Sequence, residues 1–183
     1  MDKLTEQLKE LALGAGFSRC HPLNTDALIF RKEVRDMCAA DKCKNYGKSW
    51  SCPPAIDSLD TIAKKAAGYN AGLIVQTTGH MEDLFDIEAI GKISVSHKKS
   101  WDTFVRQALA VTGYDALPMA SGACSICKKC TFPDKPCRFP KKVFPSMEAY
   151  GLWVSDVCEK SGLNYYYGEK TMTYTACILY NER

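Results

Sequence analysis

Apolar residues at helical spacing mark the beginning of the chain and a segment before its midpoint. In residues 2–14, leucines recur three and four positions apart, so they share one face of a helix, and Gly14 ends it. A second helix is expected to begin at Asp57 or Ser58, either of which is a suitable N-cap, and to run to about residue 67.

The longest helical pattern covers residues 82–111. Its apolar positions keep a three- and four-residue spacing, its charged positions form a face expected to be exposed, and Gly91 suggests a break. Another helix is expected to open at residues 145–148, with Ser146 as its N-cap, and to end by Gly162.

Several shorter segments predict strands, because they are rich in β-branched residues or alternate in polarity and are bounded by turn residues. They are residues 17–23, 71–78, 115–121 and 172–180. In the last of these, Thr173, Thr175 and Cys177 fall on one face of the strand. Residues 27–30 are expected to form one more extended piece.

Helical and extended segments alternate along the chain, which favours an α/β (or α+β) fold. The pattern predicts a single layered domain, residues 1–183, with a mixed sheet flanked by helices and two cysteine-rich loops at residues 38–54 and 124–140. A chain of 183 residues is long enough to bury a sizeable core. No linker, internal repeat or low-complexity segment divides it.

Composition and the N-terminal residues narrow the class of protein. The chain is 46% hydrophobic and 25% charged, as in ordinary globular proteins. No apolar run is long enough to cross a membrane. The first residues lack the basic and apolar parts of a secretory signal. A cytoplasmic protein with no membrane contact is therefore expected.

Ten cysteines are unusual for such a protein. In a cytoplasmic chain with its own core, they indicate metal or redox chemistry rather than disulfides. Half of the 24 Lys and Arg residues lie in residues 31–52 and 124–142, around the cysteines. Cations stabilise an anionic thiolate-ligated cluster, although a solvated basic surface would have the same composition. Nucleic-acid binding is not expected, because aromatic residues are not interleaved with the basic ones.

The loop at residues 124–140 carries the most specific signal. Cys124, Cys127 and Cys130 are separated by two residues each, and Cys137 follows after six. A turn of this spacing wraps around a [4Fe–4S] cluster and reaches three of its corners, and Cys137 would complete the fourth. Zinc is the alternative, although zinc sites usually combine two separated pairs of ligands.

The loop at residues 38–54 supplies Cys38, Cys43 and Cys52, at gaps of four and eight residues. Three interpretations remain open. The first is a second cluster, whose fourth ligand comes from elsewhere in the chain. The second is a cluster with one iron left open for a small substrate, and the third is zinc with an added ligand. The residues considered for the missing ligand are Cys20, His21 and Cys177.

Some other polar residues are candidates for chemistry, each with a structural explanation beside it. Glu148, next to the second loop, is a candidate proton donor, but a carboxylate in a first helical turn also suits the helix dipole. Arg138 is expected to pair with cluster charge or an anionic ligand. Cys158 is expected to be a core residue, and His80 and His97 are expected to lie at the surface.

Two blocks of residues together resemble a known prokaryotic family. The blocks are Arg35-x2-Cys38-x4-Cys43-x2-Tyr46-Gly47-Lys48-x3-Cys52-Pro53-Pro54 and Gly122-x-Cys124-x2-Cys127-x2-Cys130-x6-Cys137-Arg138-x-Pro140, the latter followed by Pro145-Ser146-Met147-Glu148-Ala149-x-Gly151. This arrangement is similar to the predicted metal-binding proteins called domain of unknown function 2284, over residues 30 to 160. The resemblance implies that the seven cysteines of the two loops bind metal, in an anaerobic bacterial or archaeal cytoplasm. It implies no reaction.

The sequence leaves more than one function open. One hypothesis is an electron-transfer protein with two [4Fe–4S] clusters, ringed by lysines that dock an acidic redox partner protein. Another is an enzyme that uses an open-site cluster on a small-molecule substrate. A third is a zinc-stabilised interaction module. The oligomeric state and the spatial separation of the two loops do not follow from the sequence.

Overall fold

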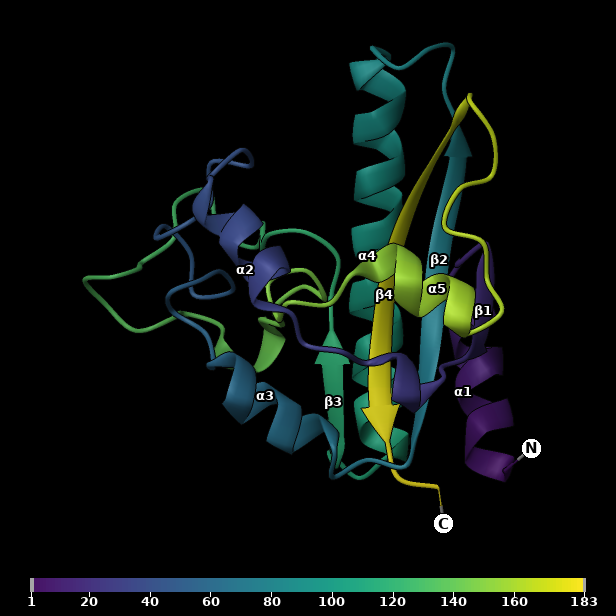
Figure 1. Cartoon of the computed structure of the whole chain (residues 1–183). Coiled ribbons are helices and arrows are strands. Elements are labelled where there is room, and N and C mark those ends of the chain that lie inside the picture. The colour runs from purple at the N-terminus through teal and green to yellow at the C-terminus, as the bar shows by residue number, and fades with distance from the viewer. Residues whose placement is uncertain (1, 183) are drawn as a thin grey trace.

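The computed structural model of the protein describes residues 2–182, and over this range one sheet organises the chain (Figure 1). Its strands are β1 (Arg19–Pro22), β2 (Ala71–His80), β3 (Ala116–Met119) and β4 (Thr171–Tyr180). They pair in the order β1-β2-β4-β3. Every strand pair is antiparallel, whereas a mixed sheet was expected, although the layered α/β architecture is confirmed.

The two ten-residue strands β2 and β4 pair along their whole length and form the centre of the sheet. Ile74 lies opposite Cys177 in this ladder. As the alternating pattern predicts, Cys177 faces one core, while its neighbours Ala176 and Ile178 face the other.

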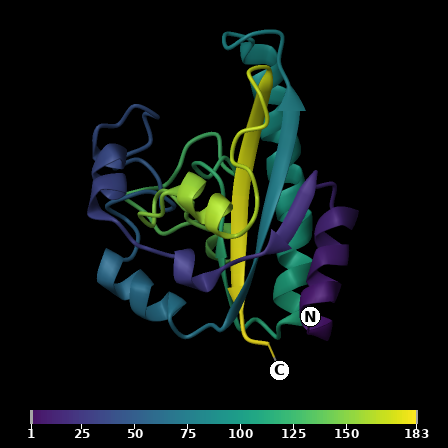
Figure 2. The same ribbon diagram turned by 45° about the vertical axis from the view of Figure 1, so that its right-hand side comes forward.

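Helices α1 (Lys3–Gly14) and α4 (Ile87–Val111) cover one face of the sheet. Their apolar stripes bury Leu8 and Phe104 against Val75 and Ile178. Figure 2 shows both helices on one side of β2 and β4. This packing explains the periodic apolar pattern that predicted both helices.

The remaining elements are shorter: α2 (Lys32–Ala39), α3 (Leu59–Ala66), α5 (Val154–Lys160) and the 3-10 turns η1 (Thr25–Ala27) and η2 (Pro140–Lys142). Figure 1 shows α2 and the loop after it projecting away from the sheet, whereas α3 and α5 help to cover the opposite face. Ile62, Met147, Leu152 and Val157 pack there against Ile74. Part of this second core therefore comes from segments outside the helices and strands. These segments are held in place by burial of their side chains and not by hydrogen bonds between paired strands.

Three local expectations need correction. Residues 25–27 form a 3-10 turn, so only Phe30 of the expected extended piece makes a β-bridge, to Leu152. Helix α4 is not broken at Gly91, which lies inside its 25 residues. It begins at Ile87, directly after the N-cap Asp86, whose carboxylate accepts a hydrogen bond from the amide of Ala89.

The helix expected at residues 145–148 is also wrong. Ser146 Oγ does accept a hydrogen bond from the amide of Ala149, at 3.1 Å. The chain then leaves the helical region at Gly151, whose φ is +86°, so α5 begins only at Val154 and ends before Gly162. Within the described residues, none of the helices combines the length and the apolar character needed to cross a membrane.

Candidate metal centre

The two cysteine loops touch each other, although about 70 residues of chain separate them. The indole nitrogen of Trp50 donates a hydrogen bond to the carbonyl oxygen of Lys135 at 3.2 Å. The amide of Cys124 donates another to Ser51 Oγ at 3.1 Å. Trp50 also packs edge-on against Phe132, with ring centroids 5.0 Å apart. Residues 49–52 of the first loop therefore form one wall of the second.

The four cysteines of the second loop line one small cavity of about 30 Å³. They are Cys124, Cys127, Cys130 and Cys137. Trp50, Phe139 and Val143 supply apolar walls, and Ser49 adds a hydroxyl from the first loop. All four cysteines are partly buried, so their sulfur atoms border both the protein and the surface.

Hydrogen bonds make the environment of Cys130 unlike that of Cys124. Burial acts to raise the pKa of Cys130, but hydrogen bonds from the amides of Phe132, Trp50 and Thr131 and from Ser49 outweigh it and lower this pKa. Burial dominates at Cys124 and raises its pKa. Amide donors around a sulfur are the feature that iron–sulfur and thiolate–metal sites use to stabilise negative charge.

The second loop is held closed by contacts within it. Arg138 Nη1 donates to the carbonyl oxygen of Lys129 at 3.0 Å, and Thr131 Oγ1 donates to that of Pro136 at 2.9 Å. The amide of Phe139 donates to Cys137 Sγ at 3.4 Å. One guanidinium nitrogen of Arg138 thus braces the turn, in addition to any role toward an anion.

The three cysteines of the first loop lie near enough to affect one another electrostatically. Burial is the main cause that raises the pKa of Cys38, and the neighbouring thiols of Cys43 and Cys52 raise it further. Burial likewise raises the pKa of Cys52, and Cys43 and Cys124 add to this effect. The pKa of Cys52 is thus affected by a thiol of each loop.

The residues considered as a fourth ligand lie elsewhere. Cys20 Sγ donates to the carbonyl oxygen of Lys9 and lies against the core under α1. His21 Nδ1 is 3.0 Å from the carbonyl oxygen of its neighbour Pro22. Cys177 is fully buried in the sheet, where burial raises its pKa strongly. Figure 1 shows β1 and α2 on opposite sides of the molecule.

Glu148 lies beside the first loop. Its carboxylate is close enough to Cys38 to raise the pKa of that thiol. Burial raises the pKa of Glu148 itself, and Oε2 has no hydrogen-bond partner among the described residues. Because residue 148 lies in a turn before α5, a helix dipole does not explain this acid.

Burial or exposure describes the positions of three other residues considered from the sequence, which are Cys158, His80 and His97. Cys158 is fully buried in the core, as expected, and its Sγ is 3.9 Å from Thr175 Oγ1. His80 is exposed, but His97 is only 1% exposed, contrary to the expected surface position. The burial was not expected from the sequence because histidine is polar, but His97 occupies the apolar face of α4, opposite Thr77.

Sequence reasoning missed Ser49, Trp50 and Ser51, which connect the loops. Ser49 and Ser51 are buried, and their hydroxyl oxygens are 3.0 Å apart. The available signal was their position immediately before Cys52 in a loop otherwise rich in lysine. Within residues 2–182, no three His, Cys, Asp or Glu side chains converge closely enough to form a ready site for a single metal ion.

The chain belongs to the family described as predicted metal-binding protein (DUF2284), whose sequence profile matches residues 21–180. The match includes both cysteine loops and most of the sheet. Searches for similar sequences among curated proteins and for similar folds among solved structures found no significant match.

Proposed function

We propose that each cysteine loop holds a [4Fe–4S] cluster and that the protein transfers electrons. Cys124, Cys127, Cys130 and Cys137 would hold one cluster, and Cys38, Cys43 and Cys52 would ligate the other. The observation that carries this proposal is the cavity bordered by all four thiols of the second loop, in contact with the first loop. Bound clusters would supply one-electron redox chemistry.

The arrangement of thiols favours a cluster over zinc. A tetrahedral zinc site with bonds of about 2.3 Å requires its sulfur atoms to converge to within about 4 Å of one another. In this chain the four thiols border one cavity, and three of them are separated by gaps of only two residues. A cube distributes its ligands over four irons, so a wider ring of sulfur atoms suits it.

The contact between the loops favours electron transfer. Cys52 and Cys124 interact electrostatically across the contact, and the Ser51 hydroxyl joins them through the Cys124 amide. Two clusters in these loops would be close neighbours. The protein between them contributes hydrogen bonds and partial burial, which tune the potential of such groups.

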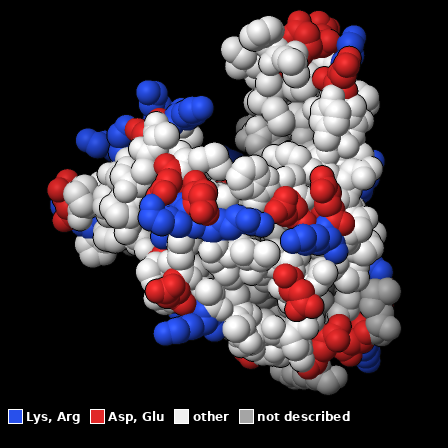
Figure 3. All heavy atoms as spheres, viewed as in Figure 1, with Lys and Arg blue, Asp and Glu red and all other residues white. Residues whose placement is uncertain are grey.

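Exposed lysines around the loops suit an acidic redox partner. Figure 3 shows several Lys and Arg side chains on the side where the loop after α2 extends. The exposed lysines of the two loops are Lys42, Lys44, Lys48, Lys128, Lys129 and Lys135. Complementary charge would steer a negatively charged protein toward the clusters and would make association weaken with added salt.

Anaerobic purification followed by iron, sulfide and zinc analysis tests the proposal. We expect about eight irons and eight sulfides per chain, because two cubes each contain four of both. Cys130→Ser and Cys43→Ser should each remove about half of the iron, while Cys20→Ser, away from both loops, should remove none. Colourless protein containing zinc and no sulfide would instead identify a zinc-stabilised interaction module.

A second candidate function is an enzyme whose first-loop cluster keeps one iron open for a small substrate. The specific observation in its favour is that Cys38, Cys43 and Cys52 interact while Cys20, His21 and Cys177 lie elsewhere. A cavity of about 150 Å³ beside this loop is lined by Met37, Glu148 and Tyr165, among others.

Electron paramagnetic resonance distinguishes the two candidates. An open iron accepts an added ligand such as cyanide, so the spectrum of the reduced protein should shift, and Cys43→Ser should abolish the shift. Cys130→Ser is the matched variant in the other loop and should retain it. A spectrum that cyanide leaves unchanged in the iron-loaded protein would exclude the enzyme with an open iron.

A further inference from the structure

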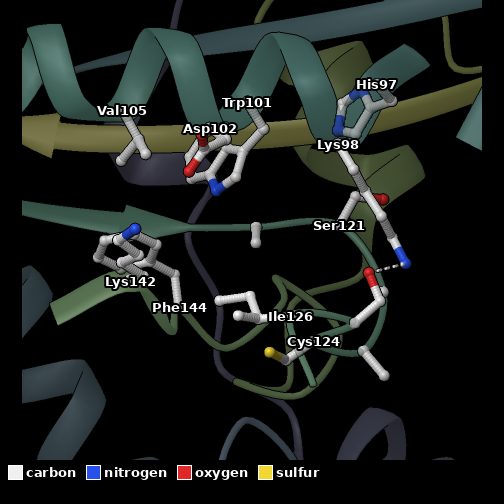
Figure 4. Close-up of a pocket in the computed structure, with 14 residues that line it drawn as sticks. His97, Lys98, Trp101, Asp102, Val105, Ser121, Cys124, Ile126, Lys142 and Phe144 are labelled. Atoms are coloured by element: carbon white, nitrogen blue, oxygen red, sulfur yellow. Dashed lines mark hydrogen bonds between the residues drawn. The ribbon is translucent and has the colours of Figure 1, made fainter. Parts of the chain in front are cut away.

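A second pocket lies on the other side of Cys124, between α4 and the segment that leads into the second loop. Its volume is about 100 Å³. Figure 4 shows Trp101 and Lys98 entering from α4, with Cys124 and Ile126 on the opposite wall. Val105, Ile126 and Phe144 make much of the lining apolar. The size approaches that of an engineered cavity of about 150 Å³ that binds benzene.

Two buried polar atoms of this wall have no hydrogen-bond partner among the described residues. They are Trp101 Nε1 and His97 Nε2, on side chains that are 8% and 1% exposed. The other ring nitrogen of His97 is satisfied by Thr77 Oγ1, at 3.0 Å. Buried polar groups are nearly always paired, so two such atoms at one pocket point to an absent partner.

The chemistry of these atoms restricts that partner. An indole N–H can only donate a hydrogen bond, so the ligand must carry an acceptor. In Figure 4 the indole nitrogen of Trp101 points toward the pocket, and His97 lies farther along α4. An acceptor atom of a ligand placed beside Trp101 would satisfy a donor that otherwise remains unpaired.

The charge around the pocket is positive. Lys98 donates a hydrogen bond to Ser125 Oγ at 3.1 Å, and Lys142 lies over the ring of Phe139. Neither ammonium group forms an ion pair within residues 2–182. The single acid of the lining, Asp102, is already 3.7 Å from Arg106 Nε. An anion would therefore find uncompensated positive charge at the rim.

We propose that this pocket binds a small organic carboxylate. The carboxylate would accept a hydrogen bond from the Trp101 indole and interact with Lys142, and its apolar body would contact Val105, Ile126 and Phe144. Inorganic phosphate fits poorly, because it carries up to two charges and has no apolar body to cover this lining. The pocket and the cysteine cavity share Cys124, so the ligand would lie directly beside the second loop.

Calorimetric titration of the full-length, anaerobically purified protein tests the proposal, with benzoate as the probe. A ligand of about nine non-hydrogen atoms is expected to bind with a dissociation constant of about 1 mM or lower. Benzamide, its uncharged counterpart, and phosphate should bind at least about tenfold more weakly.

Matched variants locate the binding site. Lys142→Met should weaken benzoate binding about tenfold, while Lys141→Met, its exposed neighbour outside the lining, should leave it unchanged. Trp101→Phe should also weaken binding, while Trp153→Phe, on another part of the surface, should not. Because Trp101 is a core residue, circular dichroism must first show that its variant is folded.

The proposal is wrong if benzoate fails to bind at about 10 mM, if benzamide binds equally well, or if Lys142→Met and Lys141→Met behave alike. Iron and sulfide are measured in the same samples. Absence of iron with intact benzoate binding would reject the cluster assignment alone, and absence of binding to iron-loaded protein would reject the carboxylate pocket alone.

Discussion

The amide of Cys124 donates a hydrogen bond to Ser51 Oγ at 3.1 Å, and this contact fastens the two cysteine loops to each other. Ser51 is 1% exposed and lies next to Cys52, so the contact is buried between potential ligands of two different sites. The loops form a single structural unit even though the sequence presents them as separate motifs.

Removal of this hydroxyl should loosen the unit. Ser51→Ala leaves the Cys124 amide without its acceptor, so we expect the free energy of unfolding to fall by about 1–2 kcal/mol. Chemical denaturation measures the change. Ser96→Ala, an exposed serine on α4, is the control and should lose no stability. Equal effects of the two substitutions would mean that the contact adds nothing to stability.

Protonation of His97 should make stability depend on pH. Burial, followed by the charge of Lys98, lowers the pKa of His97 from 6.5 to about 4. Between these values the unfolded chain binds more protons than the folded protein, so the free energy of unfolding should fall as the pH falls from 6.5 to 4. The loss from this group is at most about 3 kcal/mol.

Urea denaturation at a series of pH values measures that slope. His97→Gln should flatten it in this range whatever its effect on stability at pH 7, whereas His80→Gln, at an exposed position, should retain it. An unchanged slope in His97→Gln would show that other groups cause the acid sensitivity.

Cysteines of the core and of the loops should respond in opposite ways to substitution. Cys177 is fully buried and packs in the core, so Cys177→Ala should lower the free energy of unfolding by about 1–2 kcal/mol and leave the metal content unchanged. Cys43 is exposed, so it is not a core residue, and it is a proposed ligand of the first loop. Cys43→Ala should therefore lower the metal content of the purified protein. Loss of metal in Cys177→Ala without loss of stability would contradict this division.

Two glycines should differ sharply in their tolerance of alanine. At Gly151 the φ of +86° is unfavourable for alanine, and an added Cβ would lie 2.8 Å from the carbonyl oxygen of Arg31. We expect Gly151→Ala to cost about 2–4 kcal/mol. Gly91 lies inside α4 with open space around it, so Gly91→Ala should stabilise by about 0.5–1 kcal/mol. Thermal unfolding of both variants is the test, and equal melting temperatures would contradict the prediction.

Regular elements were predictable from sequence because their signals are local. The periodic leucines of α1 reflect one buried helix face, whereas the β-branched run of β2 and the alternation in β4 belong to strands that are buried on both faces of the sheet. The break expected at Gly91 was wrong because the surrounding apolar stripe packs on the sheet and outweighs the propensity of one glycine. The helix expected at Ser146 was wrong because Gly151 is required where the chain passes Arg31 closely.

The sequence by itself determined which residues are candidate metal ligands, since the spacing of Cys124, Cys127 and Cys130 is a property of one short loop, and it indicated family membership. Only the tertiary structure decided that the two loops touch, that Cys177 and His21 lie away from them, that Glu148 is half-buried and that His97 is buried. Contacts of this kind depend on chain segments brought together by burial of two cores on opposite faces of the sheet. Local spacing contains no information about such distant neighbours, so the pocket beside Cys124 became visible only in the folded chain.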